Sequence, residues 1–308
     1  MLQPDLICLT IGDGDKIMKG TAQMNHPAKW IESLIKDFID RSPENTLGNS
    51  ENERAWEDHL IGFSSGDDPL YQEYKEYVGP FHWTPLEIFS TTFPSFEVSA
   101  KDLTVISWVL PQSKTTKSDN RKEKIYPSER WARARIFGEE GNVKLAKHVV
   151  ASLQQAGVNA VAPSLLSSSF KWMESERYTF ASTWSERHAA YASGLGTFGL
   201  CDGLITSKGK AMRCGSVVAN IKIPATKRPY HDHHAYCLFF SKGACGKCID
   251  RCPAEALTPA GHDKVKCRNH ISNSRAYVAS HFGFQGYGCG LCQTDVPCES
   301  RIPSKHDF

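Results

Sequence analysis

Cysteines towards the end of the chain carry the clearest chemical signal. Eight of the eleven cysteines lie from residue 237 onward, in two spaced sets. The first set is Cys237, Cys245, Cys248 and Cys252, and the second is Cys267, Cys289, Cys292 and Cys298. Each [4Fe–4S] cluster takes four cysteine ligands, so the two sets predict two clusters and a protein that handles single electrons.

The spacing also predicts which cysteines share a cluster. Cys245, Cys248 and Cys252, followed by Pro253, repeat the end of the bacterial C-x2-C-x2-C-x3-C-P run, whose last cysteine ligates the other cluster. Applied here, this rule assigns one cluster to Cys237, Cys245, Cys248 and Cys298, and the other to Cys252, Cys267, Cys289 and Cys292. Two loops are longer than in that run, between Cys237 and Cys245 and between Cys292 and Cys298.

Zinc sites and disulfides are the alternatives. Paired C-x2-C motifs also bind zinc, but the C-x3-C-P element and the crossed ligand favour clusters. The first residues lack a basic start followed by a long apolar run, so we expect no secretory signal and a reducing cytoplasm, where disulfides are rare. Cys8, Cys201 and Cys214 have no partner at ligand spacing and are expected to be buried free thiols; a substrate role for Cys201 or Cys214 is the alternative.

Size and charge set wider limits. A chain of 308 residues exceeds one typical domain, so two domains are expected. Lys and Arg (36) nearly balance Asp and Glu (34), and a net charge of +2 provides no broad footprint for nucleic acid or anionic membrane. No stretch approaches 18 apolar residues, so no membrane span is expected.

The middle of the chain predicts an α/β layer. Leu103–Leu110 is the apolar, β-branched run of a buried strand. A helix capped by Asn142 follows, to about Gln155, and Val158–Ala162 is the next strand, an order typical of α/β layers. The basic segment Gln112–Lys124 is expected to be a solvated loop, and it is the only basic run that could contact RNA.

Further elements flank this layer. Helices are expected near Pro27–Ile39, over Asp67–Tyr77 and over Trp184–Ser193, the last with Thr183 and Glu186 as a capping box. Strands are expected near Gly203–Thr206 and Ser216–Ile223, before a linker at Lys227–His234. The expected division is a mixed lead-in (residues 1–100), an α/β domain (101–230) and a two-cluster ferredoxin-like domain (231–308).

Three glycines have the spacing of a nucleotide-binding fingerprint but not its order of secondary-structure elements. Gly194, Gly196 and Gly199 satisfy G-x-G-x-x-G, but a helix is expected before them and a strand after them. The dinucleotide fingerprint needs the reverse order, so the motif does not indicate NAD binding. Glycine lets a cofactor or another backbone segment approach closely, so a tight turn is expected here.

The segment Ser185–Thr206 and the cysteine pattern together carry a family resemblance. Glu186-Arg187, Ser193-Gly194-Leu195-Gly196 and Tyr287-Gly-Cys289-Gly-Leu-Cys292-Gln293 resemble the epoxyqueuosine reductases, which are related to the corrinoid-dependent reductive dehalogenases. The resemblance covers roughly residues 100–300. It implies that residues 101–230 form a cobalamin-binding domain, with the corrinoid against the Gly194–Gly199 turn, and that the two-cluster domain follows.

The resemblance implies a reductase that takes electrons from an external low-potential donor of the ferredoxin or flavodoxin type. The clusters would reduce a corrinoid, the corrinoid would act on a small or medium organic substrate, and a protein acid would supply a proton. The family places a catalytic Asp about six residues before the Glu-Arg pair, where this chain has Phe180. That departure and the near-neutral charge argue against a tRNA substrate. The alternative is a ferredoxin-like electron-transfer protein without a corrinoid.

The sequence offers only weak candidates for the proton donor. His188 and Tyr191 lie beside the glycine turn, but a packed aromatic for Tyr191 and a surface or hydrogen-bonded residue for His188 are the favoured interpretations. Arg187 is expected to pair with a neighbouring acid, with an anion clamp as the alternative. A further group of histidines precedes Cys237 and is expected to form a polar linker, with a hydrogen-bonding or metal role near the cluster as the alternative: His231, His233 and His234.

Overall fold

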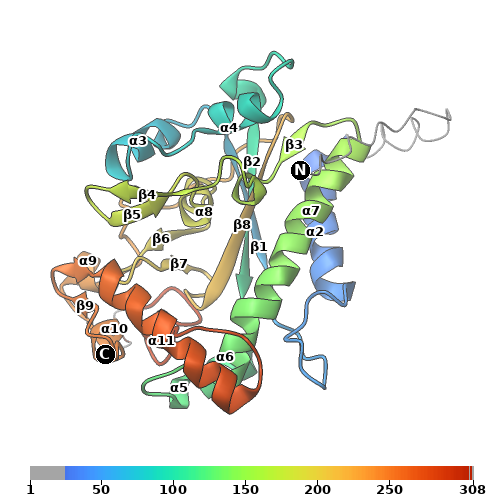
Figure 1. The fold of residues 1–308 in the computed structure, drawn as a ribbon. Coiled ribbons are helices and arrows are strands. Elements are labelled where there is room, and N and C mark those ends of the chain that lie inside the picture. The colour runs from blue at the N-terminus through green and yellow to red at the C-terminus, as the bar shows by residue number, and fades with distance from the viewer. Residues whose placement is uncertain (1–24, 305, 307–308) are drawn as a thin grey trace.

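A four-stranded antiparallel sheet forms the centre of this mixed α/β fold (Figure 1). The computed structural model describes residues 25–304 and residue 306. The sheet order is β1-β2-β8-β3, with β1 at Leu60–Ser65, β2 at Thr104–Pro111, β8 at Met212–Ala219 and β3 at Ala160–Val161. Because β8 lies between β2 and β3 and runs antiparallel to both, the expected strand–helix–strand unit is split by a later strand.

Both faces of the sheet are buried, which explains the unbroken apolar run of β2. Ile106, Trp108 and Leu110 belong to one hydrophobic core, and Val105 and Val109 belong to a second core on the opposite face. This alternation follows from the two-residue period of a strand. The strand expected at Leu103–Leu110 is thereby confirmed within one residue at each end.

Helices cover both faces of the sheet and give three layers. The first core packs α2 (Pro27–Arg41) and α7 (Glu139–Gln155) against one face. The second core packs α3 (Leu70–Tyr77), α4 (Pro85–Thr92) and α8 (Glu186–Ala192) against the other. Short 3₁₀ turns lie at η1 (Ala100–Asp102) and η3 (Pro163–Leu165). The helices expected near Pro27–Ile39 and Asp67–Tyr77 are confirmed.

The basic segment after β2 is a helix, which corrects the expectation of a solvated loop. α5 spans Lys114–Lys122, and Ser113 is its N-cap: the Ser113 hydroxyl accepts a hydrogen bond from the Thr116 amide. Thr116, Lys117 and Asn120 are buried. The segment has no apolar periodicity, and its helical state depends on the cap and on contacts made by Asn120 with distant residues.

Asn142 does not cap a helix, because the helix begins earlier. α6 (Glu129–Arg133) continues through a π-helical segment (Ala134–Gly138) into α7. Asn142 therefore lies inside α7, where its amide accepts a hydrogen bond from Trp108 Nε1 at 2.8 Å and donates one to the Cys214 carbonyl at 3.1 Å. The residue ties the helix to two strands of the sheet.

The cap of α8 also differs from the expectation. Ser185, and not Thr183, accepts the amide hydrogen of His188, and Glu186 reaches away from the helix end towards Ser216. The strand expected at Ser216–Ile223 lies four residues earlier, as β8. Two hairpins accompany α8: β4 (Trp172–Ser175) with β5 (Thr179–Ser182), which was not expected, and β6 (Gly196–Phe198) with β7 (Leu204–Thr206).

The C-terminal part consists of short elements and one long helix. These are α9 (Leu238–Lys242), α10 (Lys247–Asp250), β9 (Leu257–Thr258), β10 (Gly261–His262), α11 (Lys264–Phe282) and η4 (Leu291–Gln293). A third core joins this part to Leu200, Cys201 and Ile205 from the β6–β7 hairpin region. The domain boundary at residue 230 remains a prediction. No helix in the described ranges is long and apolar enough to cross a membrane.

Candidate functional site

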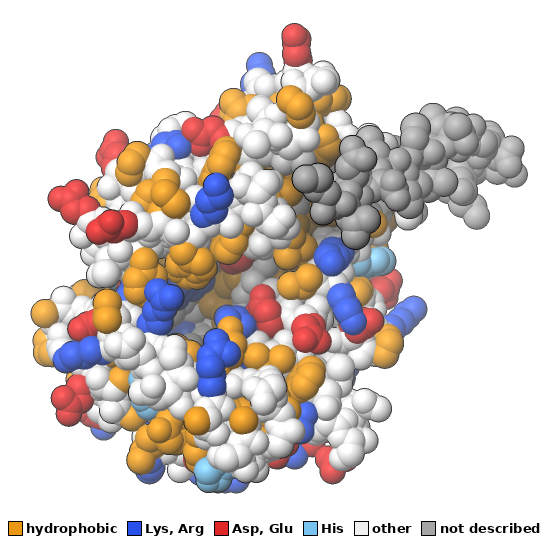
Figure 2. Space-filling view, in the orientation of Figure 1, with side chains coloured by type: hydrophobic (Ala, Val, Ile, Leu, Met, Phe, Trp, Pro, Cys, Tyr) orange, Lys and Arg blue, Asp and Glu red, His pale blue; other side chains and the backbone are white. Residues whose placement is uncertain are grey.

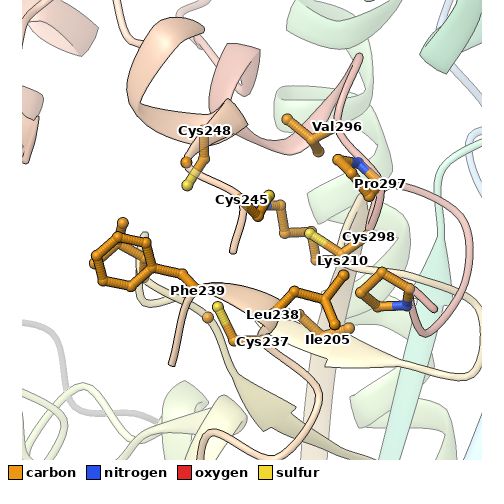
Figure 3. A pocket seen from close by; sticks show the side chains of 14 residues that line it. Ile205, Lys210, Cys237, Leu238, Phe239, Cys245, Cys248, Val296, Pro297 and Cys298 are labelled. Atoms are coloured by element: carbon orange, nitrogen blue, oxygen red, sulfur yellow. The ribbon is translucent and has the colours of Figure 1, made fainter. Parts of the chain in front are cut away.

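Four cysteines surround one cavity between α9, α10 and the segment after η4 (Figure 3). They are Cys237, Cys245, Cys248 and Cys298. Cys237 is the N-cap of α9, and Cys248 lies in α10. Cys245, between the two helices, has a φ of 82°, a conformation that costs a non-glycine residue about 1–3 kcal/mol. No carboxylate lines this cavity, so its donor set consists of soft sulfur atoms.

The other four cysteines form a second group next to the first. The Cys267 and Cys252 thiols are electrostatic neighbours of the Cys289 thiol. Cys289 is in turn an electrostatic neighbour of Cys292. Cys267 lies in the first turn of α11, and Cys292 lies in η4. Burial raises the pKa of the Cys289 thiol to about 11, so the Cys289 thiol stays protonated at neutral pH unless a cation binds it.

The crossed ligand pattern expected from the sequence assigns Cys298 to one cluster and Cys252 to the other, and this assignment stays a prediction. Cys298, from the second set in sequence, lies with the first group, and Cys252 lies with the second. No three Cys, His, Asp or Glu side chains in the described ranges converge as the ligands of a single metal ion would. A [4Fe–4S] cluster is larger than one ion, so its ligands stand further apart. Iron binding at these thiols stays a prediction.

α5 supports the loops that carry these cysteines. The Asn120 amide donates hydrogen bonds to the Cys289 carbonyl at 3.3 Å and to Thr294 Oγ1 at 3.2 Å. Arg251 donates to the carbonyls of Asn120 and Leu291, and so clamps the segment after α10 to the segment around η4. The helix that the sequence did not reveal is therefore part of the scaffold of the second group.

Two residues that the sequence did not connect with the cluster cysteines lie among them. Cys201 is buried, as expected, but its thiol lies next to those of Cys248 and Cys292. Lys210 lines the first cavity, and its Nζ lies 3.3 Å from Cys201 Sγ. Cys214 is a half-buried free thiol elsewhere, and Cys8 lies outside the described residues. No sequence spacing links Cys201 or Lys210 to the cysteine motifs.

Protein packing accounts for the glycine turn. A Cβ atom at Gly196 would lie 2.3 Å from the Ile205 carbonyl oxygen, and one at Gly194, with φ of 78°, would lie 2.8 Å from the Lys227 carbonyl oxygen. The Gly194, Gly196 and Gly199 amides donate to Tyr191, to Tyr230 and to Gly203. The turn thus brings protein segments together, and a corrinoid contact there stays a prediction.

The two weak candidates for a proton donor sit in aromatic packing. The His188 ring lies 4.7 Å from the Tyr74 ring, and its Nδ1 lies 2.8 Å from Ser185 Oγ. Burial lowers the pKa of His188 well below its usual value, so the imidazole is neutral. Tyr191 is buried and stacks on Tyr230, and burial raises its pKa. Both environments suit packing roles.

Glu186 is a buried acid that the sequence had assigned only to a cap. Ser216 Oγ donates a hydrogen bond to Glu186 Oε2, and Oε1 has no partner in the described part of the chain. Burial raises the pKa of Glu186 to about 7. The residue as a whole is half-buried, and its Oε1 atom is buried. The Glu-Arg pair in the sequence was the only signal that pointed to this residue.

Charged side chains line the region around Glu186. Arg213 Nε lies 2.6 Å from Glu139 Oε2, and Arg135 donates a hydrogen bond to the Tyr287 hydroxyl at 2.8 Å. Figure 2 shows the surface hollowed in this part of the molecule, between the β4–β5 hairpin and α11. We call this hollow the cleft. Glu186, Arg213 and Glu139 are all electrostatic neighbours of the Cys214 thiol. Arg187 donates to the Asp202 carbonyl, and the ion pair expected for it does not form in the described residues.

Phe180, where the resemblance calls for an acid, anchors the β4–β5 hairpin. The Arg268 guanidinium of α11 lies 5.3 Å from the centre of the Phe180 ring, and Trp172 packs against the ring edge-on. The histidines before Cys237 are surface residues as expected for a linker, except that His234 stacks on Phe240 at 3.9 Å.

Part of the chain is similar in sequence to curated proteins of known name. The chain is 31% identical over 119 residues to the epoxyqueuosine reductase of Bacillus cereus, a match that spans 37% of this chain and 29% of that protein. The epoxyqueuosine reductase of Staphylococcus aureus is 29% identical over 129 residues, spanning 40% of this chain and 32% of the relative. The chain is similar in sequence to the epoxyqueuosine reductases over part of its length. Because it matches under a third of their length, their activity and partners enter only as proposals.

Solved structures and family models complete the comparison. No protein-family model matches the sequence. The structure of epoxyqueuosine reductase from Streptococcus thermophilus aligns with a TM-score of 0.44 at 18% identity, over 89% of this chain and 68% of that one. A catabolic reductive dehalogenase aligns with a TM-score of 0.46 at 12% identity, over 95% of this chain and 40% of that one.

Proposed function

We propose that the chain is an iron–sulfur reductase in which two [4Fe–4S] clusters pass electrons to a corrinoid that acts on a small or medium organic substrate. The observation that carries the proposal is the grouping of the eight cysteines, with Cys298 among the first four and Cys252 among the second. An external low-potential donor of the ferredoxin or flavodoxin type would supply the electrons. Each cluster accepts and releases one electron at a time.

The donor set fits clusters. The first cavity is lined by four thiols, one ammonium group and apolar side chains. Thiolates select soft metal centres, and exclusion of carboxylates removes competing ligands for hard cations. Cys237, Cys245, Cys248 and Cys298 would hold one cluster, and Cys252, Cys267, Cys289 and Cys292 the other. The cytoplasm is the proposed compartment, since it keeps such thiols reduced.

The corrinoid is proposed in the cleft. A corrinoid, when bound, supplies a strongly reducing metal centre, and the protein supplies geometry and electrostatics. Glu186 Oε1 lacks a partner among the described residues, and Arg213 and Arg187 keep part of their surface open. A buried polar atom without a hydrogen bond costs about 1–3 kcal/mol, which a bound ligand would recover. The amides of the glycine turn, in contrast, are used by the protein.

Glu186 is the residue we infer to deliver the proton. A general acid works best when its pKa lies near the working pH, and burial raises the pKa of Glu186 to about 7. The Ser216 hydroxyl holds Oε2, which leaves Oε1 as the oxygen able to carry and donate the proton. Glu186 would thereby take the role of the catalytic Asp that the family has where this chain has Phe180. His188 and Tyr191 would remain packing residues.

Metal content tests the proposal. The protein is produced anaerobically with added cobalamin, purified by gel filtration and analysed for iron, cobalt and zinc. Roughly eight iron atoms and one cobalt atom per chain are expected for two clusters and a corrinoid. Iron without cobalt would remove the corrinoid and favour the electron-transfer protein, the alternative that the occupied amides of the glycine turn support. Zinc with little iron would overturn the cluster assignment.

A further inference from the structure

Lys210 places an ammonium group inside the cysteine region. The residue is 3% exposed and lines the cavity formed by Cys237, Cys245, Cys248 and Cys298. Its Nζ lies 3.3 Å from Cys201 Sγ, and the Cys298 thiol is an electrostatic neighbour of the ammonium group. In the described ranges Lys210 forms no ion pair with a carboxylate. Lysine is almost never fully buried without a partner, so this placement requires a compensating anion.

Neutral thiols do not provide that compensation; hydrogen bonds from Cys248 and Cys292 lower the pKa of the Cys201 thiol, and its thiolate would supply a single negative charge. Removing an ammonium group from water costs several kcal/mol, and a neutral thiol is only a weak hydrogen-bond acceptor. A cluster bound through four thiolates carries negative charge at the place that Lys210 faces. The buried ammonium group is therefore explained if the cavity holds an anionic centre.

Cys201 links this charge to both groups of cysteines. Its thiol lies next to Cys248 of the first group and Cys292 of the second, and it is the acceptor for Lys210. It does not line the first cavity itself, unlike Cys237. This position suits a residue that orients Lys210 between the two sites, rather than a cluster ligand.

We propose that Lys210, oriented by Cys201, raises the reduction potential of the cluster held by Cys237, Cys245, Cys248 and Cys298. The proposal rests on the cluster function proposed above. Reduction adds an electron, and a fixed positive charge in a low-dielectric site stabilises the more negative state. Lys210 and Cys201 are positioning residues, and they make this cluster the easier of the two to reduce.

A redox titration followed by electron paramagnetic resonance tests the role of Lys210. Lys210→Met is expected to keep the full iron content while its cluster becomes harder to reduce, about tenfold less reduced at a fixed potential, or about 59 mV for one electron. Lys210→Arg keeps the charge and should stay near the wild-type potential. Lys75→Met, which removes the cation of the Lys75–Glu87 ion pair on the other side of the molecule, is the matched control and should shift nothing.

The Cys201 variants separate orientation from ligation. Cys201→Ala is expected to retain all iron and to shift the potential in the same direction as Lys210→Met, whereas Cys201→Ser should shift it less. This pair also carries the test if Lys210→Met fails to fold. Loss of about half the iron in Cys201→Ala would make Cys201 a ligand and overturn the proposal. An unshifted Lys210→Met in iron-loaded protein would overturn it too, whereas wild-type protein without iron would overturn the cluster function itself.

Discussion

Ser216 on β8 donates a hydrogen bond to the carboxylate of Glu186, the first residue of α8. The bond ties the helix to the central sheet. Burial raises the pKa of Glu186 to about 7, far above the 4.5 of a solvated glutamate. The carboxyl group is therefore protonated in mildly acidic solution and only half ionised near neutrality.

This pKa makes stability depend on pH. Between pH 4.5 and 7 the unfolded chain releases the Glu186 proton while the folded chain keeps it, so stability is lost as pH rises through this window and is constant above it. The loss amounts to about 3 kcal/mol, at 1.36 kcal/mol per pKa unit. Glu186→Gln, which cannot ionise, should lack this loss. Thermal midpoints at pH 5 and pH 8 measure it, and exposed Glu140→Gln is the control that should behave as wild type.

Crossed ligation predicts an unusual pattern of iron loss. Cys298→Ser should remove the cluster of the first group, although Cys298 lies in the second set along the chain, and should leave about half the iron. Cys252→Ser should remove the other cluster. Iron analysis together with the optical spectrum of each variant measures this. Cys214→Ser is the control and should keep all the iron; loss of both clusters in Cys298→Ser would instead indicate a shared, interdependent site.

Because position 180 holds Phe instead of an acid, we expect that the chain does not share the tRNA substrate of the epoxyqueuosine reductases. Phe180 packs under Arg268 and supplies no proton, and the net charge of +2 provides little attraction for a polyanion. We expect that the chain fails to restore queuosine in the tRNA of a strain that lacks epoxyqueuosine reductase. Mass spectrometry of tRNA nucleosides measures this, with an authentic epoxyqueuosine reductase as the positive control. Restored queuosine would show that another acid, with Glu186 first in line, serves that reaction.

We expect that substitution of Asn142, inside α7, lowers the stability of the fold. Its amide joins the buried Trp108 Nε1 to the Cys214 carbonyl, in a bond that is partly buried. Asn142→Leu leaves the buried Trp108 donor unpaired, which should cost about 1–3 kcal/mol. Thermal unfolding measures the loss. Gln155→Leu, at an exposed position of the same helix, should change the midpoint little.

Local patterns in the sequence were sufficient for several features. The alternating burial of β2 follows from its apolar run, and Pro27 at the start of α2 marks that helix. The C-x2-C-x3-C-P spacing predicts two groups of cysteines in the same way, although it assigns the distant Cys298 to the first group only through the known ligation rule. The strand and the helix need only neighbours in sequence, so a single chain without relatives reveals them.

Tertiary structure alone decided the rest. α5 depends on contacts of Asn120 with residues more than 160 positions away, and no periodicity in its own sequence reveals them. Glu186 becomes an acid with a pKa near neutrality, and Lys210 becomes a buried charge beside Cys201, only because distant segments exclude water from both. Hydrophobic pattern and ligand spacing are local properties, whereas desolvation and electrostatic pairing belong to the assembled fold. The cysteine motif thus follows from the sequence, and the chemistry around it from packing.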